Sequence, residues 1–177
     1  CMFKPKHVYI EKEALDYTLG KELKKQFEDM QIPVDILESN RVNFLRGKSV
    51  QEKYEIGKRV LVIGVRRTLE FQSCKPSAHY QLPLVTGCIG KCEYCYLNTN
   101  LKDKPFTRIY VNLDDILKKA KRYTQTGKFK PTIFEGSATS DPVPVEPYTH
   151  ALAKSIEFFA KDPNTRFRFV TKFTDID

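Results

Sequence analysis

Three cysteines that lie close together constrain this chain more than any other feature of its sequence. Cys88, Cys92 and Cys95 form a C-x3-C-x2-C run. Clustered thiolates are the soft ligands that iron–sulfur clusters and zinc select, and a structural zinc site needs four protein ligands. The nearest further candidates stand at no usual zinc-ligand spacing: Cys1, Cys74 and His79. The spacing favours an iron–sulfur cluster with one open iron, and leaves a zinc site or unrelated thiols as alternatives.

The composition indicates a folded, positively charged protein. With 177 residues, of which 41% are hydrophobic, the chain can bury a core, which excludes a disordered class. The formal net charge of +8 suits a polyanion such as nucleic acid, although a merely basic protein is the alternative. Five cysteines, three of them in one loop, do not form a secreted disulfide framework and favour a reducing cytosol. No apolar run approaches the length of a membrane-spanning helix, so no membrane partner is expected.

Hydrophobic periodicity predicts a small α/β domain over residues 1–75. The expected elements alternate along the chain: a strand at 6–10, a helix at 15–30, a strand at 32–37, a helix at 50–56 and a strand at 59–66. Gly20 is able to break the first helix, and the basic segment 41–48 is read as a loop or a ribbon. The β-α-β-α-β order predicts a parallel sheet layer.

Residues 76–177 have the pattern of the first half of a TIM-type (β/α) barrel. Strands are expected at 82–86, 132–135 and 166–171, with helices at 112–123 and 146–161. The first of these strands opens into the cysteine loop, and active groups at the carboxyl ends of strands are the rule in such folds. Three strands do not close a barrel, so the chain is expected to be the front part of a longer protein.

The cysteine loop, which ends in the aromatic Tyr96, resembles the signature loop of the radical S-adenosylmethionine enzymes. In that superfamily the open iron binds the amino and carboxylate groups of S-adenosylmethionine, and the reduced cluster cleaves it to a 5′-deoxyadenosyl radical. The resemblance implies a 4Fe-4S cluster held by Cys88, Cys92 and Cys95. It also implies S-adenosylmethionine as cofactor and an external electron donor for the cluster.

Three motifs in the same order resemble the spore photoproduct lyase family within that superfamily. They are YCYL at 94–97, FEGSATSDP at 134–142 and VTKF at 170–173. The resemblance covers nearly the whole chain and implies a radical S-adenosylmethionine partial barrel. It also implies a lyase acting on DNA that carries the thymine dimer called spore photoproduct. The radical takes a hydrogen from the lesion, the bond joining the two thymines breaks, and a hydrogen is returned. A monomer in the cytoplasm, in the spore core of a spore-forming bacterium, is expected.

The resemblance assigns roles to single positions. Tyr94 and Tyr96 match tyrosines implicated in hydrogen transfer after the cysteine step, with aromatic packing as the alternative. Ser140 and Lys172 match positions that contact S-adenosylmethionine, and Ser137 and Tyr96 are further candidates for that site. A lysine at a strand end can meet the methionyl carboxylate, and a hydroxyl can meet its polar groups.

One position departs from the family. Ala138 stands where the family has a cysteine that returns the hydrogen atom, and an alanine methyl group cannot replace a thiol in that step. The final step is therefore expected to be impaired in this form. Ala138 is either an engineered replacement or the natural residue of a member that uses another donor, and engineering is the favoured explanation. Cys74 is expected to be a packed or spare thiol. If the form with Ala138 repairs the lesion cleanly, Tyr94 and Tyr96 are the first residues to examine as the hydrogen donor.

Two other function classes stay open from the sequence. One is a different radical S-adenosylmethionine enzyme that acts on nucleic acid, and the other is a zinc-binding nucleic-acid module without enzymatic activity. For the lesion-repair reading, the damaged base has to leave the duplex stack to reach a buried cluster. Phosphate contacts with salt-dependent affinity are then expected.

Overall fold

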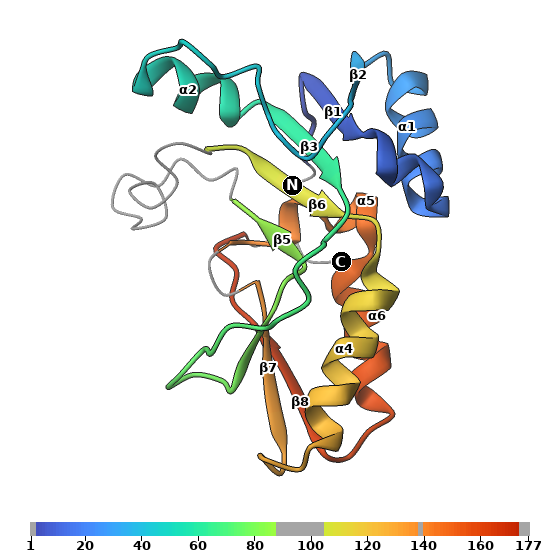
Figure 1. Cartoon of the computed structure of the whole chain (residues 1–177), viewed down its shortest axis with the longest axis vertical. Coiled ribbons are helices and arrows are strands. Elements are labelled where there is room, and N and C mark those ends of the chain that lie inside the picture. The colour runs from blue at the N-terminus through green and yellow to red at the C-terminus, as the bar shows by residue number, and fades with distance from the viewer. Residues whose placement is uncertain (1–2, 88–104, 138–139, 174–177) are drawn as a thin grey trace.

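Two β-sheets and the helices beside them make up the described part of the chain. The computed structural model of the protein describes residues 3–87, 105–137 and 140–173. In Figure 1 the first sheet lies with α1 and α2 in the upper half, and the second sheet lies with α4 and α6 in the lower half. The mixed α/β class predicted from the sequence is confirmed.

The first sheet has five strands in the order β2-β1-β3-β6-β5, and only the β5–β6 pair is antiparallel. Its strands in chain order are β1 (His7–Glu11), β2 (Val34–Leu37), β3 (Val60–Gly64), β5 (Val85–Thr86) and β6 (Thr107–Tyr110). Helices α1 (Thr18–Asp29) and α2 (Val50–Gly57) connect the first three strands. The predicted parallel β-α-β-α-β layer is therefore confirmed.

Alternating side chains give this sheet two apolar faces. Val8 and Ile10 of β1 join Phe27 of α1 in the main core. Tyr9, between them, faces the other way and stacks on Phe44 with 4.0 Å between ring centroids. Phe44 belongs to the basic segment 41–48, which is a loop that covers this second face.

Strand β6 is not predicted from the sequence. It pairs in parallel with β3, with Leu61 opposite Thr107 and Ile63 opposite Ile109. The five-stranded sheet therefore takes strands from both sides of the boundary predicted between residues 75 and 76, and the main core is also continuous across it. The boundary itself stays a prediction.

The second sheet has three parallel strands in the order β4-β7-β8. They are β4 (Tyr80–Leu82), β7 (Thr132–Gly136) and β8 (Thr165–Phe169). Helices α4 (Leu113–Gln125) and α6 (Ala151–Ala160) lie side by side beside this sheet (Figure 1). Phe159 of α6 stacks on Phe134 of β7 and Phe167 of β8, with ring centroids 5.0 and 5.5 Å apart. This arrangement is consistent with a partial barrel, which stays a prediction.

The prediction of one strand at 82–86 is wrong, because two strands, β4 and β5, occupy this part of the chain. Pro83 has no N–H to donate to a sheet ladder. At this point the chain passes from the second sheet to the first. The cysteine loop that follows therefore begins between the two sheets.

The helix expected at 146–161 is also divided. His150 has a φ of 52°, in the left-handed region, and separates α5 (Glu146–Thr149) from α6. The carboxylate of Glu146 then accepts hydrogen bonds from the backbone N–H groups of Leu152 at 2.8 Å and Ala153 at 3.0 Å. A carboxylate at this position satisfies N–H groups that the first turn of a helix leaves unpaired.

Gly20 lies inside α1 and does not break it. A Cβ at this position would come 1.9 Å from the carbonyl oxygen of Ala14, so only glycine lets the helix pack this closely on the preceding 3-10 turn. The described residues contain 3-10 turns at Lys12–Asp16 and Val143–Val145. None of the helices within the described residues has the length and apolar character that crossing a bilayer requires.

Candidate functional site

The predicted site residues that the structure describes lie at the carboxyl ends of β7 and β8. They are Ser137, Ser140 and Lys172. The other predicted site residues lie outside the described residues: Cys88, Cys92, Tyr94, Cys95, Tyr96 and Ala138. Their predicted roles therefore stay predictions, and the geometry of the site is built from the side chains around them.

Ser137 and Ser140 hold the backbone of β5 from the end of β7. The hydroxyl of Ser137 accepts a hydrogen bond from the N–H of Val85 at 2.8 Å, and the hydroxyl of Ser140 donates to the carbonyl of Val85 at 2.7 Å. Both serines are buried. Val85 lies three residues before Cys88, so the two hydroxyls set the direction in which the chain enters the cysteine loop.

Ser137 has a φ of 54°, in the left-handed region that favours glycine. Its N–H donates to the carbonyl of Leu82 at 2.9 Å, so the unusual backbone is held in place by β4. Such conformations cost roughly 1–3 kcal/mol and cluster at functional sites. The backbone conformation of the turn after β7 is therefore stabilised by a tertiary hydrogen bond and not by the intrinsic preference of serine.

Asp141 connects the turn after β7 to the end of β8. Its buried carboxylate accepts hydrogen bonds from the hydroxyl of Thr171 at 2.8 Å and the N–H of Lys172 at 2.9 Å. The second carboxylate oxygen accepts from the N–H of Val143 at 3.2 Å. The ammonium of Lys172 is exposed and has no hydrogen-bond or ion-pair partner among the described residues. Asp141 thus fixes the lysine backbone while the charged end stays available to a ligand.

A cluster that sequence reasoning missed lies on the opposite face of β7 from α6. Since Phe134 and Phe167 pack on α6, their neighbours Glu135 and Arg168 project from the other face. There the guanidinium of Arg168 lies 3.4 Å from one oxygen of the Glu135 carboxylate. The other oxygen accepts hydrogen bonds from the thiol of Cys74 at 2.7 Å and the hydroxyl of Ser77 at 2.9 Å.

The thiol of Cys74 is held in its protonated form. Burial, reinforced by the hydrogen bond to the Glu135 carboxylate, raises the pKa of this thiol above its ordinary value. At neutral pH the sulfur therefore carries a hydrogen that is directed at Glu135. Cys74, expected from the sequence to be a packed or spare thiol, is half-buried and belongs to the polar cluster on this face of β7. The alternation of Phe134 and Glu135 in β7 is the sequence signal that identifies this face.

A hollow beside the site lies between the two sheets. Its wall includes Arg66 from the end of β3, Thr86 of β5 and Ser137 after β7, together with residues of the 70–72 and 81–83 segments. It therefore joins the carboxyl ends of both sheets at the point where the cysteine loop begins.

Lys172 and Ser140 have the chemical groups that suit a ligand with both a carboxylate and an amino group, as S-adenosylmethionine has. The Lys172 ammonium can meet the carboxylate, and the Ser140 hydroxyl, which already donates to β5, keeps lone pairs for an amino group. For the metal, no group of three or more His, Cys, Asp or Glu side chains comes together within residues 3–87, 105–137 and 140–173. The prediction of an iron–sulfur cluster therefore rests on the spacing of Cys88, Cys92 and Cys95.

Comparison with known proteins gives one consistent family. A family model described as spore photoproduct lyase matches residues 3–177. The spore photoproduct lyase of Clostridium acetobutylicum is 53% identical over 171 residues, which are 97% of this chain and 51% of that protein. The enzyme of Bacillus subtilis is 46% identical over 176 residues, which are 99% of this chain and 52% of that protein. The chain spans about half the length of the curated relatives it matches.

Among solved structures, those of spore photoproduct lyase have the same fold as this chain. A double-mutant form of spore photoproduct lyase with bound AdoMet and dinucleoside spore photoproduct superposes with a TM-score of 0.92 at 49% identity, covering 98% of this chain and 51% of that one. A second spore photoproduct lyase, complexed with dinucleoside spore photoproduct, has a TM-score of 0.92 at 48% identity with the same coverage.

Proposed function

Because this chain belongs to the spore photoproduct lyase family, we propose that the full-length protein is a DNA-repair lyase that converts spore photoproduct to two thymines. The observation that carries the proposal is the family match over residues 3–177. The donors after β7 and β8, which suit the cofactor of such an enzyme, support it. A single-subunit protein in the cytoplasm belongs to the same proposal.

The proposed cofactors are a 4Fe-4S cluster on Cys88, Cys92 and Cys95 and S-adenosylmethionine beside it. When bound, they supply the deoxyadenosyl radical that removes a hydrogen atom from the lesion. Ser137 and Ser140 contribute by holding β5 where it enters the cysteine loop. Tyr96 stays a candidate for the cofactor site by resemblance.

The proposed function is tested by product analysis on the full-length protein, reconstituted with iron and sulfide without oxygen. With S-adenosylmethionine, a reductant and the dinucleoside spore photoproduct, thymine is the expected product. If the protein binds iron and cleaves S-adenosylmethionine but leaves the lesion intact, it is a different radical enzyme. If it binds zinc and no iron–sulfur absorption appears, the zinc-module hypothesis replaces the proposal.

Lys172→Ala is expected to weaken the binding of S-adenosylmethionine by about 1.5–3 kcal/mol, the usual range for a hydrogen bond to a charged group. The reason is that the described residues leave its ammonium without a partner while Asp141 fixes its backbone. Calorimetry on the reconstituted full-length protein measures the change. Lys154→Ala, which removes an exposed lysine on α6, is the matched control. An affinity equal to that of the parent protein would remove Lys172 from the cofactor site.

For the return of hydrogen, we propose Cys74 as the donor that serves in place of a thiol at position 138. In this step the S–H bond of Cys74 breaks, its hydrogen atom joins the carbon radical of the thymine, and the unpaired electron stays on sulfur. Tyr94 or Tyr96 can then pass a phenolic hydrogen atom to the sulfur, and the unpaired electron moves to the tyrosine oxygen. The protonated thiol on the face of β7 away from α6 supports this role.

A further inference from the structure

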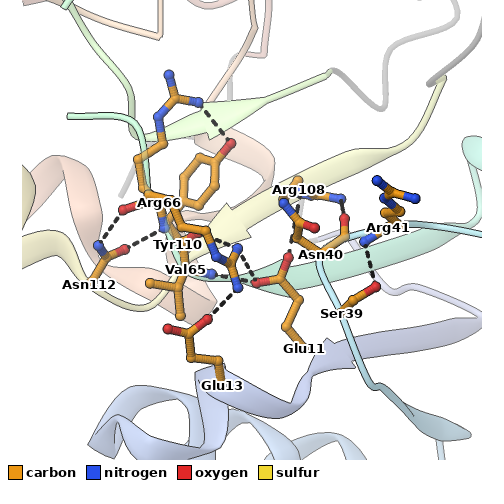
Figure 2. Close-up of polar contacts among 11 residues, drawn as sticks. Glu11, Glu13, Ser39, Asn40, Arg41, Val65, Arg66, Arg108, Tyr110 and Asn112 are labelled. Atoms are coloured by element: carbon orange, nitrogen blue, oxygen red, sulfur yellow. Dashed lines mark hydrogen bonds and ion pairs between the residues drawn. The ribbon is translucent and has the colours of Figure 1, made fainter. Parts of the chain in front are cut away.

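The carboxyl end of the five-stranded sheet carries a cluster of arginines around one buried glutamate (Figure 2). The side chain of Glu11, at the end of β1, is 1% exposed. One of its oxygens accepts a hydrogen bond from the N–H of Val65 at 2.8 Å and another from Arg67 at 3.3 Å. The other oxygen lies 3.7 Å from the guanidinium of Arg108 and has no hydrogen-bond donor among the described residues. This carboxylate therefore anchors two arginines at the sheet edge.

Gly64 of β3 makes room for the Glu11 carboxylate. A Cβ at this position would come 2.7 Å from a carboxylate oxygen. The glutamate can thus lie flat against the sheet, where burial and the Val65 N–H hold it. The cluster is built into the fold, because Glu11 projects from β1 and its carboxylate is bonded to the backbone N–H of Val65, directly after β3.

Arg66 is held by hydrogen bonds from both its backbone and its side chain, and none of them involves a carboxylate. The side-chain amide of Asn112 binds the backbone of Arg66: it accepts a hydrogen bond from the Arg66 N–H and donates one to the Arg66 carbonyl, each at 2.8 Å. The guanidinium donates to the hydroxyl of Tyr110 at 3.3 Å and the carbonyl of Thr68 at 3.0 Å, and lies over the Tyr110 ring. No carboxylate pairs with Arg66 within the part of the chain that the structure describes.

Arg41 occupies the other side of the cluster. Figure 2 shows Arg66 and Arg41 on either side of the contact between Glu11 and Arg108. The segment that carries Arg41 is tied to the cluster, since Arg108 donates to the carbonyl of Asn40 at 3.1 Å. Arg41 is exposed, and its guanidinium also has no carboxylate partner among the described residues.

The balance of charge favours an anion. Four guanidinium groups meet two carboxylates, because Glu13 pairs with Arg67 and Glu11 is shared between Arg67 and Arg108. The two guanidinium groups without a carboxylate partner among the described residues are those of Arg66 and Arg41, on the two sides of the cluster. Planar guanidinium groups match the geometry of phosphate oxygens, and Arg is preferred over Lys where such geometry matters.

The position of the cluster relates it to the candidate site. Arg66 lines the hollow that also contains Thr86 and Ser137. Arg41 and Arg108 line a second hollow beside Phe106, at the start of β6. The two hollows thus lie beside Thr86 at the end of β5 and Phe106 just before β6, which stand on either side, in sequence, of the segment that carries the cysteines.

We propose that Arg66 and Arg41, set around the Glu11–Arg108 ion pair, bind backbone phosphates of the DNA strand that flanks the lesion. The inference rests on the proposed function for the identity of the nucleic acid. Lesion chemistry takes place at the ends of β7 and β8, while the neighbouring sheet edge holds the strand on which the lesion lies. Phosphate contacts position a nucleic acid without reading its sequence, which suits an enzyme that has to act at any site of damage.

The test compares two substrates in the full-length, reconstituted protein. A single-stranded oligonucleotide with a central spore photoproduct has flanking phosphates, whereas the dinucleoside spore photoproduct has none. Arg66→Gln and Arg41→Gln are each expected to weaken oligonucleotide binding about tenfold at low salt. Each is also expected to lower the slope of log affinity against log salt concentration by roughly one. Arg166→Gln, an exposed arginine at the other end of β8, is the matched control.

Two further measurements separate this role from others. Arg66→Lys keeps the charge and loses the planar fork, so its salt slope should equal that of the parent protein while its affinity falls. Turnover of the dinucleoside and affinity for S-adenosylmethionine should be unchanged in Arg41→Gln, because Arg41 lines the hollow whose described residues include no candidate cofactor residue. A parent-like salt slope and affinity in both glutamine variants overturn the inference, and so does a loss confined to dinucleoside turnover or cofactor binding. A parent protein that leaves the bond between the two thymines of the dinucleoside intact overturns the proposed function instead, because oligonucleotide binding is measured independently.

Discussion

Cys88→Ala, Cys92→Ala and Cys95→Ala are each expected to leave the full-length protein without its iron–sulfur cluster. Three thiolates in one short loop provide every protein ligand of the predicted site, so the loss of one leaves a second iron without a protein ligand. Iron content and the absorption spectrum after anaerobic reconstitution measure the effect. The expected outcome is near-complete loss of bound iron in all three variants.

Cys74→Ala is the matched control for these variants. Its thiol is hydrogen-bonded to Glu135 on the face of β7 away from α6, and it is the one cysteine that the structure describes. The variant should keep parent levels of iron. Loss of iron in Cys74→Ala would make Cys74 a fourth ligand and would end the hypothesis of an open iron for S-adenosylmethionine.

Cys74→Ser is expected to abolish clean repair by the full-length protein. Serine can keep the hydrogen bond to the Glu135 carboxylate, but its O–H bond is too strong to give a hydrogen atom to a thymine radical. Hydrogen abstraction and cleavage of the dimer bond should continue, because both precede the donor step. The thymine radical should then be trapped by external species such as the dithionite-derived radical anion, which gives adducts that mass spectrometry detects.

A second thiol provides the control for this experiment. Ala138→Cys in the Cys74→Ser background places a donor where the family has one, and should restore the yield of thymine. If Cys74→Ser repairs as cleanly as the parent protein, the donor is elsewhere and Tyr94 or Tyr96 is examined next. If the parent protein itself produces adducts, the impairment expected from Ala138 is correct and Cys74 is not a donor.

Sequence motifs were sufficient to identify the family. The spacing of Cys88, Cys92 and Cys95 predicted the metal centre, and the 134–142 motif narrowed the family that the comparisons then showed. The first three strands and their helices were also predictable, because a buried run such as Val60–Gly64 has a strong hydrophobic signal.

Strand β6 was beyond the reach of periodicity. It has four residues, and its partner β3 lies more than forty residues earlier in the chain. A short strand is stabilised by the ladder it joins, so its own sequence contains little of the signal. Because β6 pairs with β3, strands β6 and β5 from the second half of the chain complete the first sheet.

Asn112 shows how tertiary contacts decide the role of a side chain. Its position just before α4 follows from sequence, because an asparagine ahead of two acidic residues is typical of a helix start. Its side chain makes no capping hydrogen bond and holds the peptide of Arg66 instead. Only the packing of β3 beside β6 brings these two residues together.

The sequence by itself determined which chemical groups this protein has: three clustered thiols, a lysine and serines after predicted strands, and an alanine at the position for which the family resemblance implies a cysteine. Tertiary structure decided what those groups touch. The hydroxyls of Ser137 and Ser140 bind the backbone of Val85, and the thiol of Cys74 binds Glu135. The physical reason is that hydrogen bonds act over about 3 Å. Partners more than fifty residues apart are therefore set by the fold and leave no local pattern in the chain.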